Sequence, residues 1–394
     1  MTERRKLPRT VVLLGVVSFL NDFASDIVIP LLPILLATVL GSGPLALGLI
    51  EGVADAVASF LKLWAGRHSD RMQGRRKGLA VAGYTLSNIA RPLLALAGSW
   101  AGVLVLRAVD RVGKGIRSAP RDALLADVTP AGMHGYAFGF HRALDNGGAV
   151  AGSLAAAAVL AWSGMGLREV ILWSALPGAL AVLSLVVGVK EPAAGAPVAR
   201  PGSLPPLRWA GLSPPMRRYL LVLALFTLAR ASETFILLLG HQLGVGVVEL
   251  LLLWAALNLA KALTSTSGGR MADRVGRESL LLTGWVAFAA AFFALGRVSG
   301  AGGLWTVTLL YGLFMGLTEG AERAAISDYC GAGERGTAFG WYYLVLGLAA
   351  IPGGLLFGVL WQELGAGIAF TFAAALAALS ASLLRIWAWP RVTA

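Results

Sequence analysis

The chain is built from apolar runs that are long enough to cross a lipid bilayer. VVLLGVVSFL near the N-terminus and FTFAAALAALSASLL near the C-terminus are two of them. An α-helix needs roughly 20 apolar residues to span the hydrocarbon core. Of the 394 residues, 57% are hydrophobic and 14% are charged, which is too few charges to cover a soluble protein of this length. The sequence therefore predicts an all-α membrane protein with many spans.

Polar or turn-forming residues divide the chain into twelve predicted spans in two sets of six. The spans are 10–39, 44–66, 78–98, 100–120, 135–161, 167–189, 218–241, 245–268, 279–297, 302–327, 337–362 and 365–388. Residues 190–217 between the two sets contain seven prolines and no apolar period, which indicates a linker. The predicted domains are thus a bundle at 1–189, a linker at 190–217 and a bundle at 218–394.

Basic residues concentrate in alternate connections between the spans. They are Arg4, Arg5, Lys6 and Arg9; Arg67, Arg71, Arg75, Arg76 and Lys77; Lys190, Arg200, Arg208, Arg217 and Arg218; and Arg270, Arg274 and Arg277. The opposite connections hold little beyond Arg168 and Arg297. Cytoplasmic loops carry the excess of lysine and arginine, so both termini and the linker are predicted to be cytoplasmic. The net charge of +12 is then a topology signal, and no nucleic-acid partner is expected.

The two halves repeat one another. GRHSDRMQGRRK at 66–77 follows the second span, and GRMADRVGRE at 269–278 follows the eighth. The tripeptide Ala-Phe-Gly occurs at 137–139 and again at 338–340. Internal repeats joined by a polar linker are a known plan of secondary transporters.

In these residues the chain resembles the major facilitator superfamily (MFS) along its whole length. The loop motif of that family, G-x-x-x-D-R-x-G-R-[RK], fits the second copy, and it fits the first copy with one extra residue. The matching positions are Gly269, Asp273, Arg274, Gly276 and Arg277, and Gly66, Asp70, Arg71, Gly74 and Arg75. The resemblance implies two pseudo-symmetric six-helix bundles, alternating access, a cytoplasmic gate at these ten residues and a monomer.

Glycines in the fifth span resemble the Gly-rich stretch of MFS antiporters, g-x8-G-x3-G-P-x2-G-G. Gly139, Gly148 and Gly152 match its first three glycines, while Ser153 replaces the proline. The resemblance implies the bacterial drug and metabolite antiporters of the inner (cytoplasmic) membrane. Ordinary close packing of helices through small residues is the alternative.

The fourth span contains RAVDRVGKGIRSAPRD at 107–122, the most charged stretch of the apolar region. Arg107, Asp110 and Arg111 share one helix face at spacings of three and four. A charge at the bilayer centre costs about 2.5–3.5 kcal/mol on insertion scales, so it faces a cavity or a partner. A cavity role and a structural ion pair both remain open for these three residues. The following charges, Lys114, Arg117, Arg121 and Asp122, are interpreted as a collar at the lipid headgroups.

Charged side chains of other spans complete the candidate site. Burial disfavours an ionised carboxylate and a nearby arginine favours it, so an acid facing an arginine can exchange a proton for a competing ligand. The predicted proton-coupling residues are Asp22, Asp26, Asp110 and Glu233. Guanidinium groups bind anions in a bidentate way. The predicted substrate-cavity residues are Asn21, Arg107, Arg111, His141, Arg142, Asp145, Asn146 and Arg230. A satisfied structural pair is the alternative for each of them.

Other functional classes find little support in the chain. VGKGIRS lacks the spacing of a phosphate-binding loop, no catalytic set stands out, and the single cysteine, Cys330, excludes a disulfide framework. We therefore expect no enzyme and no cofactor, with the lipid bilayer, protons and a small-molecule substrate as partners. The leading hypothesis is proton-coupled antiport that exports a small organic molecule, anionic or amphipathic. A divalent-metal exporter using Asp22, Asp26, His141, Asp145 and Asn146 is the alternative. Proton-coupled uptake and a non-transporting receptor also remain open.

Overall fold

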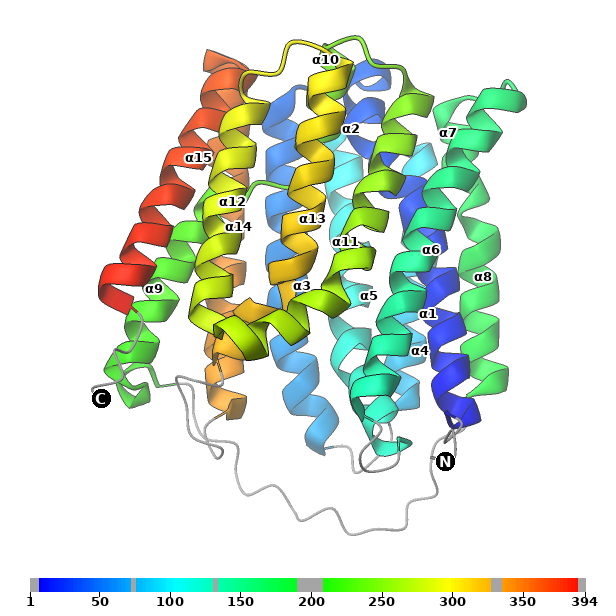
Figure 1. Ribbon diagram of the computed structural model, residues 1–394. Helices are drawn as coiled ribbons and strands as arrows, with labels where there is room; N and C mark the ends of the chain where they lie inside the picture. The colour runs from blue at the N-terminus through cyan, green and yellow to red at the C-terminus, as the bar shows by residue number, and fades with distance from the viewer. Residues whose placement is uncertain (1–6, 72–75, 130–133, 190–207, 327–334, 389–394) are drawn as a thin grey trace, which may run out of the picture. The chain divides into compact units, whose positions relative to one another are not determined.

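The computed structural model describes residues 7–71, 76–129, 134–189, 208–326 and 335–388, and the regular structure of these residues is helical (Figure 1). The α-helices are α1 (Arg9–Val28), α2 (Leu32–Ile34), α3 (Pro44–Arg71), α4 (Lys77–Leu93), α5 (Trp100–Asp127), α6 (His134–Trp162), α7 (Leu167–Trp173), α8 (Ala175–Leu183), α9 (Pro214–Ala229), α10 (Thr234–Gln242), α11 (Val247–Val275), α12 (Arg277–Leu295), α13 (Ala301–Ile326), α14 (Arg335–Leu364) and α15 (Ala366–Leu383). Short 3-10 or π segments are η1 (Ile29–Leu31), η2 (Leu35–Val39), η3 (Leu94–Leu96), η4 (Ser184–Gly188), η5 (Trp209–Gly211) and η6 (Leu384–Ala388).

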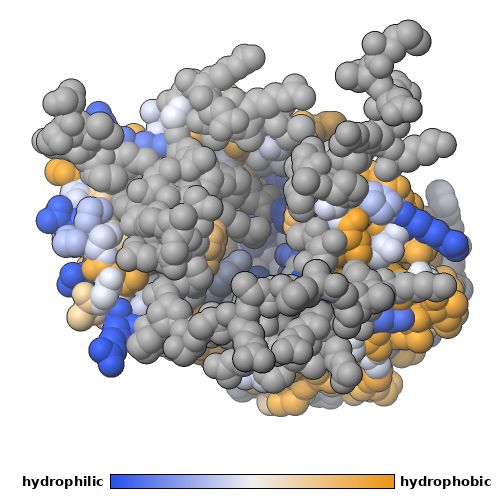
Figure 2. All heavy atoms as spheres, turned by 90° about the horizontal axis from the view of Figure 1, so that it is seen from below, coloured by the Kyte–Doolittle hydropathy of each residue, from blue (hydrophilic) through white to orange (hydrophobic). Residues whose placement is uncertain are grey.

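Eleven of the described helical segments are long and apolar enough to cross a membrane. They coincide with eleven of the twelve predicted spans. The exception is α5, because it carries the charged stretch that begins at Arg107 and no long part of it is apolar. Large apolar side chains are exposed on the spanning helices, among them Leu96, Val187 and Leu263, and orange apolar residues are visible at the surface in Figure 2. On a multi-pass membrane protein these side chains are suited to contact lipid.

Several of the spans are not continuous α-helix, among them Arg9–Val39, Pro214–Gln242 and Leu167–Gly188, in which Ser174 separates α7 from α8. The span Arg9–Val39 changes from α-helix to a 3-10 turn at Ile29–Leu31, where Pro30 and Pro33 prevent regular helical hydrogen bonds. The span Pro214–Gln242 breaks between α9 and α10, where residues 230–233 are not helical and Arg230 has ψ 74°. No proline lies at this second break. Instead, the hydroxyl of Ser232 accepts a hydrogen bond from the Thr234 backbone N–H at 3.4 Å, a local bond that competes with helix.

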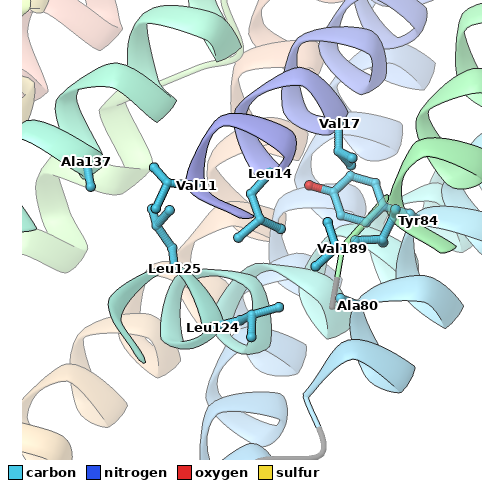
Figure 3. Close-up of a cluster of buried hydrophobic side chains, with 10 residues drawn as sticks. Val11, Leu14, Val17, Ala80, Tyr84, Leu124, Leu125, Ala137 and Val189 are labelled. Atoms are coloured by element: carbon cyan, nitrogen blue, oxygen red, sulfur yellow. The ribbon is translucent and has the colours of Figure 1, made fainter. Parts of the chain in front are cut away.

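Contacts divide the chain into two compact units. The first unit comprises Met1–Ile29, Leu61–Ala97 and Val105–Leu204. Figure 3 shows part of its apolar core, where Val11, Leu14 and Val17 of α1 lie near Tyr84 of α4 and Leu125 of α5.

Helices α1 and α6 of the first unit touch backbone to backbone. A Cβ atom built on Gly148 would lie 2.3 Å from the Phe19 carbonyl oxygen, and one on Gly152 would lie 2.3 Å from that of Phe23. No side chain fits at these two points, so the fifth-span glycines allow close packing of α6 on α1.

The second unit comprises Pro30–Phe60, Gly98–Leu104 and Pro205–Ala394. Its helix α3 meets α14 through glycines on both sides. A Cβ on Gly48 would lie 2.1 Å from the Gly354 carbonyl oxygen, and one on Gly358 would lie 2.8 Å from the Pro44 carbonyl oxygen. Residues 30–60 thus group with the later helices, although they precede the linker. The division into bundles at 1–189 and 218–394 stays a prediction.

Candidate functional site

Asp110 of α5 lies at the centre of a buried ion-pair network in the first unit. Its Oδ1 accepts a hydrogen bond from Arg91 Nε at 3.0 Å, and its Oδ2 accepts one from Arg107 Nη1 at 3.3 Å. Ser87 Oγ donates to its backbone oxygen at 2.8 Å. The side chains of Asp110, Arg91 and Arg107 are at most 3% exposed. A carboxylate clamped between two guanidiniums in the protein interior fits a structural role better than a role in releasing protons.

Arg91 joins three helices, and it was not among the site residues predicted from the sequence. Its Nη1 donates to the backbone and side-chain oxygens of Asn21 at 3.0 and 3.1 Å and to Asn88 Oδ1 at 3.0 Å. It thereby ties α4 to α1 as well as to Asp110 on α5. The available signal was an arginine inside an apolar span, where a charge requires a partner.

Arg117 is buried, with 4% of its surface exposed. It donates to Ser87 Oγ at 2.7 Å, and its guanidinium lies 4.8 Å from the centre of the Tyr84 ring. The interpretation of Arg117 as part of a headgroup collar is therefore wrong, because α4 covers it. Arg121 and Asp122, which pair with each other at 2.8 Å, are 17% and 48% exposed.

The remaining candidates of the first unit lie on α1 and α6. Asn21 Nδ2 donates to Asp22 Oδ1 at 2.8 Å. His141 Nδ1 lies 3.5 Å from Asp145 Oδ2. Asp145, together with Lys114, Arg117 and Arg91, is among the charged groups that act on Asp22. The structure thus brings the carboxyl groups of Asp22 and Asp145 into electrostatic range of each other.

The other predicted residues of the first unit differ in exposure. Asp26 and Arg111 are buried, and Arg142 and Asn146 are partly exposed. Among the residues that the structure describes, no three His, Cys, Asp or Glu side chains form a group that could hold a metal ion. The metal-exporter alternative therefore gains no observation in its favour.

Glu233 lies at the break between α9 and α10 in the second unit and is held by two partners. Lys261 Nζ of α11 donates to its Oε1 at 2.6 Å, and Tyr311 of α13 donates its hydroxyl proton to the same oxygen at 2.7 Å. The side chains of Glu233 and Lys261 are 24% and 19% exposed. The acid–base pair is thus accessible although it lies within a membrane span.

Arg230, at the other end of the break, pairs with Glu322 of α13. Its Nη1 donates to Glu322 Oε2 at 3.2 Å, and Tyr342 of α14 donates its hydroxyl to Oε1 at 2.7 Å. The side chain of Arg230 is 31% exposed and that of Glu322 is 11% exposed. Lys261 and Glu322 are noticeable in the sequence as charges within apolar spans, whereas Tyr311 and Tyr342 carry no such signal and were missed.

Two acids of α3 lie close to the same break. Ser232 Oγ donates to Glu51 Oε2 at 3.4 Å. Asp55, one helical turn along the same face, is exposed and acts electrostatically on Arg230. Helices α3, α10, α11, α13 and α14 therefore all contribute polar side chains around residues 230–233.

The second copy of the loop motif lies at the turn from α11 to α12. Gly276 has φ 87° and ψ 144°, a backbone conformation that only glycine adopts without strain. This accounts for glycine at that motif position. Of the other motif residues, Gly74 and Arg75 lie outside the described residues. The remaining motif residues and Gly139 lie in helices, and the structure describes only their backbone. These motif residues are Gly66, Asp70, Arg71, Gly269, Asp273, Arg274 and Arg277.

Comparison with known proteins identifies the family of the chain. A family model described as Major Facilitator Superfamily matches residues 14–255 and 219–394. The chain belongs to the major facilitator superfamily. An uncharacterised MFS-type transporter of Methanocaldococcus jannaschii is 31% identical over 389 residues, which cover 96% of this chain and 95% of the relative. The resemblance to an MFS transporter is thus confirmed, and the protein is a multi-pass membrane transporter of small molecules rather than an enzyme.

Solved structures extend the likeness to the fold. The nucleoside transporter NupG has a TM-score of 0.74 at 14% identity, with 97% of this chain and 100% of that chain covered. The human organic anion transporter MFSD10 (TETRAN) has a TM-score of 0.70 at 20% identity, with 95% of this chain and 99% of that chain covered. At these identities the likeness concerns the fold alone.

Proposed function

We propose that this MFS transporter is a proton-coupled antiporter that exports a small organic molecule, anionic or amphipathic, across a bacterial cytoplasmic membrane. In this proposal α5 is the twelfth span and the two sets of six spans form two bundles. The linker at 190–217 and both termini are cytoplasmic, and the monomer is the transporting unit. The ten loop-motif residues form the cytoplasmic gate.

The observation that carries the proposal is the accessible acid–base pair at the helix break, Glu233 with Lys261 and Tyr311. Discontinuous helices near the membrane midplane form substrate and ion sites in secondary transporters. An ionisable side chain inside a span is costly, so its presence there favours a functional role. Glu233 combines both features, because it ends the break and its carboxylate is accessible.

Exchange follows from competition for one carboxylate. A proton and an N–H or O–H donor of the substrate cannot occupy the same oxygen of Glu233 at once. When both have left, Lys261 and Tyr311 hold the carboxylate, which lowers the cost of its charge inside the membrane. Release of substrate outside therefore lets a proton take its place, and the return of the proton-loaded carrier completes the exchange.

The remaining predicted residues enter the proposal with different roles. Asp22 and Asp26 of α1 are further proton-coupling candidates, while Asp110 is assigned to the structural network with Arg91 and Arg107. The proposed substrate-cavity residues are Asn21, Arg111, His141, Arg142, Asp145, Asn146 and Arg230.

The test is the sign of proton movement in sealed liposomes that contain the purified protein and a pH-sensitive dye. Ligands come from a panel of organic amines, acids and nucleosides, and those that raise the unfolding temperature are carried into the flux assay, since binding to the folded state stabilises it. Adding such a ligand outside should make the lumen more alkaline, because ligand enters as protons leave. Acidification of the lumen, or no change, would refute antiport.

A matched pair of variants assigns the coupling. Glu233→Gln should remove the proton signal while ligand-for-ligand exchange continues, because the amide no longer takes up a proton. Glu363→Gln makes the same chemical change at an exposed position of α14 and should leave both signals unchanged.

A further inference from the structure

Two oppositely charged side chains of the second unit lie near the middle of spanning helices and are accessible. Asp55 lies at the midpoint of the span Pro44–Ala65, and Arg230 lies close to the midpoint of Pro214–Gln242. Asp55 is exposed and the Arg230 side chain is 31% exposed. A charge at this depth is costly in hydrocarbon, which favours water or a polar ligand on the accessible side of each residue.

The α3 face that carries Asp55 is directed toward the helix break. The hydrogen bond from Ser232 to Glu51, at 3.4 Å, fixes this face against residues 230–233. Asp55 follows Glu51 by four residues and therefore shares its face. Asp55 acts electrostatically on Arg230, yet no ion pair joins the two residues in the described part of the chain. The two side chains are thus within electrostatic range of each other but do not form an ion pair.

Arg230 also keeps binding capacity. A guanidinium has five N–H donors, and the hydrogen bond that Arg230 makes to Glu322 uses Nη1. Arg91, Arg107 and Arg117, in the first unit, are at most 4% exposed and lie within the buried network. Among these four arginines, Arg230 is the one that a molecule entering from water can reach.

We propose that the second unit binds a zwitterionic substrate, with an anionic group, such as a carboxylate, on Arg230 and a protonated amino group on Asp55. Glu322 and Tyr342 act as positioning residues that hold the guanidinium at the break. The proposal rests on the proposed transport function and adds the charge pattern of the substrate. A carboxylate accepts two parallel hydrogen bonds from a guanidinium, and an ammonium donates to a carboxylate, so each end of the substrate has a matching partner.

The experiment compares three forms of one molecule by thermal stabilisation of the full-length protein in detergent. The probes are phenylalanine and leucine, their N-acetyl derivatives, which keep only the negative charge, and their amides, which keep only the positive charge. A zwitterion should bind about tenfold to a hundredfold more tightly than either derivative, because each derivative loses one charged hydrogen bond. Equal affinity for the three forms, or stabilisation by neither zwitterion, would overturn the proposal.

Variants identify which end binds where. In Arg230→Gln, the amide and the zwitterion should bind equally well, because the partner of the carboxylate is gone. In Asp55→Asn, the N-acetyl form and the zwitterion should bind equally well. Arg297→Gln, near the end of α12, is the matched control and should keep the preference of the wild type. If a variant at position 55 or 230 keeps the wild-type preference for the zwitterion, the binding role assigned to that residue is refuted.

Two further arms keep the result decisive. If Arg230→Gln is not recovered folded, Arg230→Lys should still prefer the zwitterion but bind it more weakly, since an ammonium lacks the bidentate geometry. In the liposome assay, exchange of protons for uncharged compounds alone would leave antiport standing while removing the zwitterion proposal. Loss of proton exchange with every ligand would instead refute the proposed function.

Discussion

Replacing Asp110 by asparagine tests whether its carboxylate has a structural role or a role in proton coupling. The change keeps the shape of the side chain and removes the charge that Arg91 and Arg107 share. Both guanidiniums are at most 3% exposed, so water cannot replace the lost partner. Removing one member of a buried ion pair costs about 3–5 kcal/mol. At about 2.1 cal/mol/K per residue of unfolding entropy, this corresponds to a drop of roughly 4–6 °C in the unfolding midpoint of a 394-residue chain.

The assay is thermal unfolding of the purified protein, followed by tryptophan fluorescence in detergent, alongside proton-coupled flux in liposomes. Asp122→Asn is the control, because its carboxylate is 48% exposed and its pair with Arg121 should contribute less than about 1 kcal/mol. If Asp110→Asn unfolds at the wild-type temperature and loses only proton coupling, the structural assignment of Asp110 is refuted.

Three further predictions concern helix packing, the loop motif and the acid–base pair. Gly148→Ala should lower stability by about 1–3 kcal/mol because its Cβ would meet the Phe19 carbonyl oxygen at 2.3 Å, whereas Gly147→Ala, whose nearest neighbour is 3.7 Å away, should change the unfolding midpoint little; equal shifts would contradict the backbone contact. Gly276→Ala should cost on the order of 1–3 kcal/mol through its positive φ alone, since its Cβ would meet nothing within 4 Å; an unchanged midpoint would argue against that turn. Tyr311→Phe should slow proton-coupled flux severalfold without abolishing it, because Lys261 still pairs with Glu233; flux at the wild-type rate would exclude the hydroxyl from coupling.

Eleven of the twelve spans were predictable from the sequence, because bilayer thickness sets a length that an apolar run either reaches or does not. The 3-10 turn in the first span was not predicted, although Pro30 and Pro33, which interrupt helical hydrogen bonding, were a signal for it. The break at 230–233 had no such signal, because no proline lies there. It depends on Ser232 and on contacts from Glu322 and Lys261, which are far away in the chain.

The pairing of charges was less predictable than their presence. Arg230 and Glu322 are 92 positions apart, and Lys261 and Glu233 are 28 apart, so no local spacing connects them. The burial of Arg117 was not predicted, for a related reason. Its position near the end of an apolar run fits a headgroup collar, and only the packing of Tyr84 over it shows that it is buried.

The break at residues 230–233 also makes α10 a short rigid lever. Its nine residues measure about 13 Å at 1.5 Å per residue. A tilt of about 20° at the break would carry its far end by roughly 4–5 Å while every hydrogen bond inside α9 and α10 stays intact, as in hinge motions at element ends. The orientation of α10 is held by its packing, since residues 234–240 are all buried, and by the ion pairs of Arg230 and Glu233 at the break. A ligand that draws one of these two side chains from its partner would therefore remove one restraint on a hinge motion at the point where it binds.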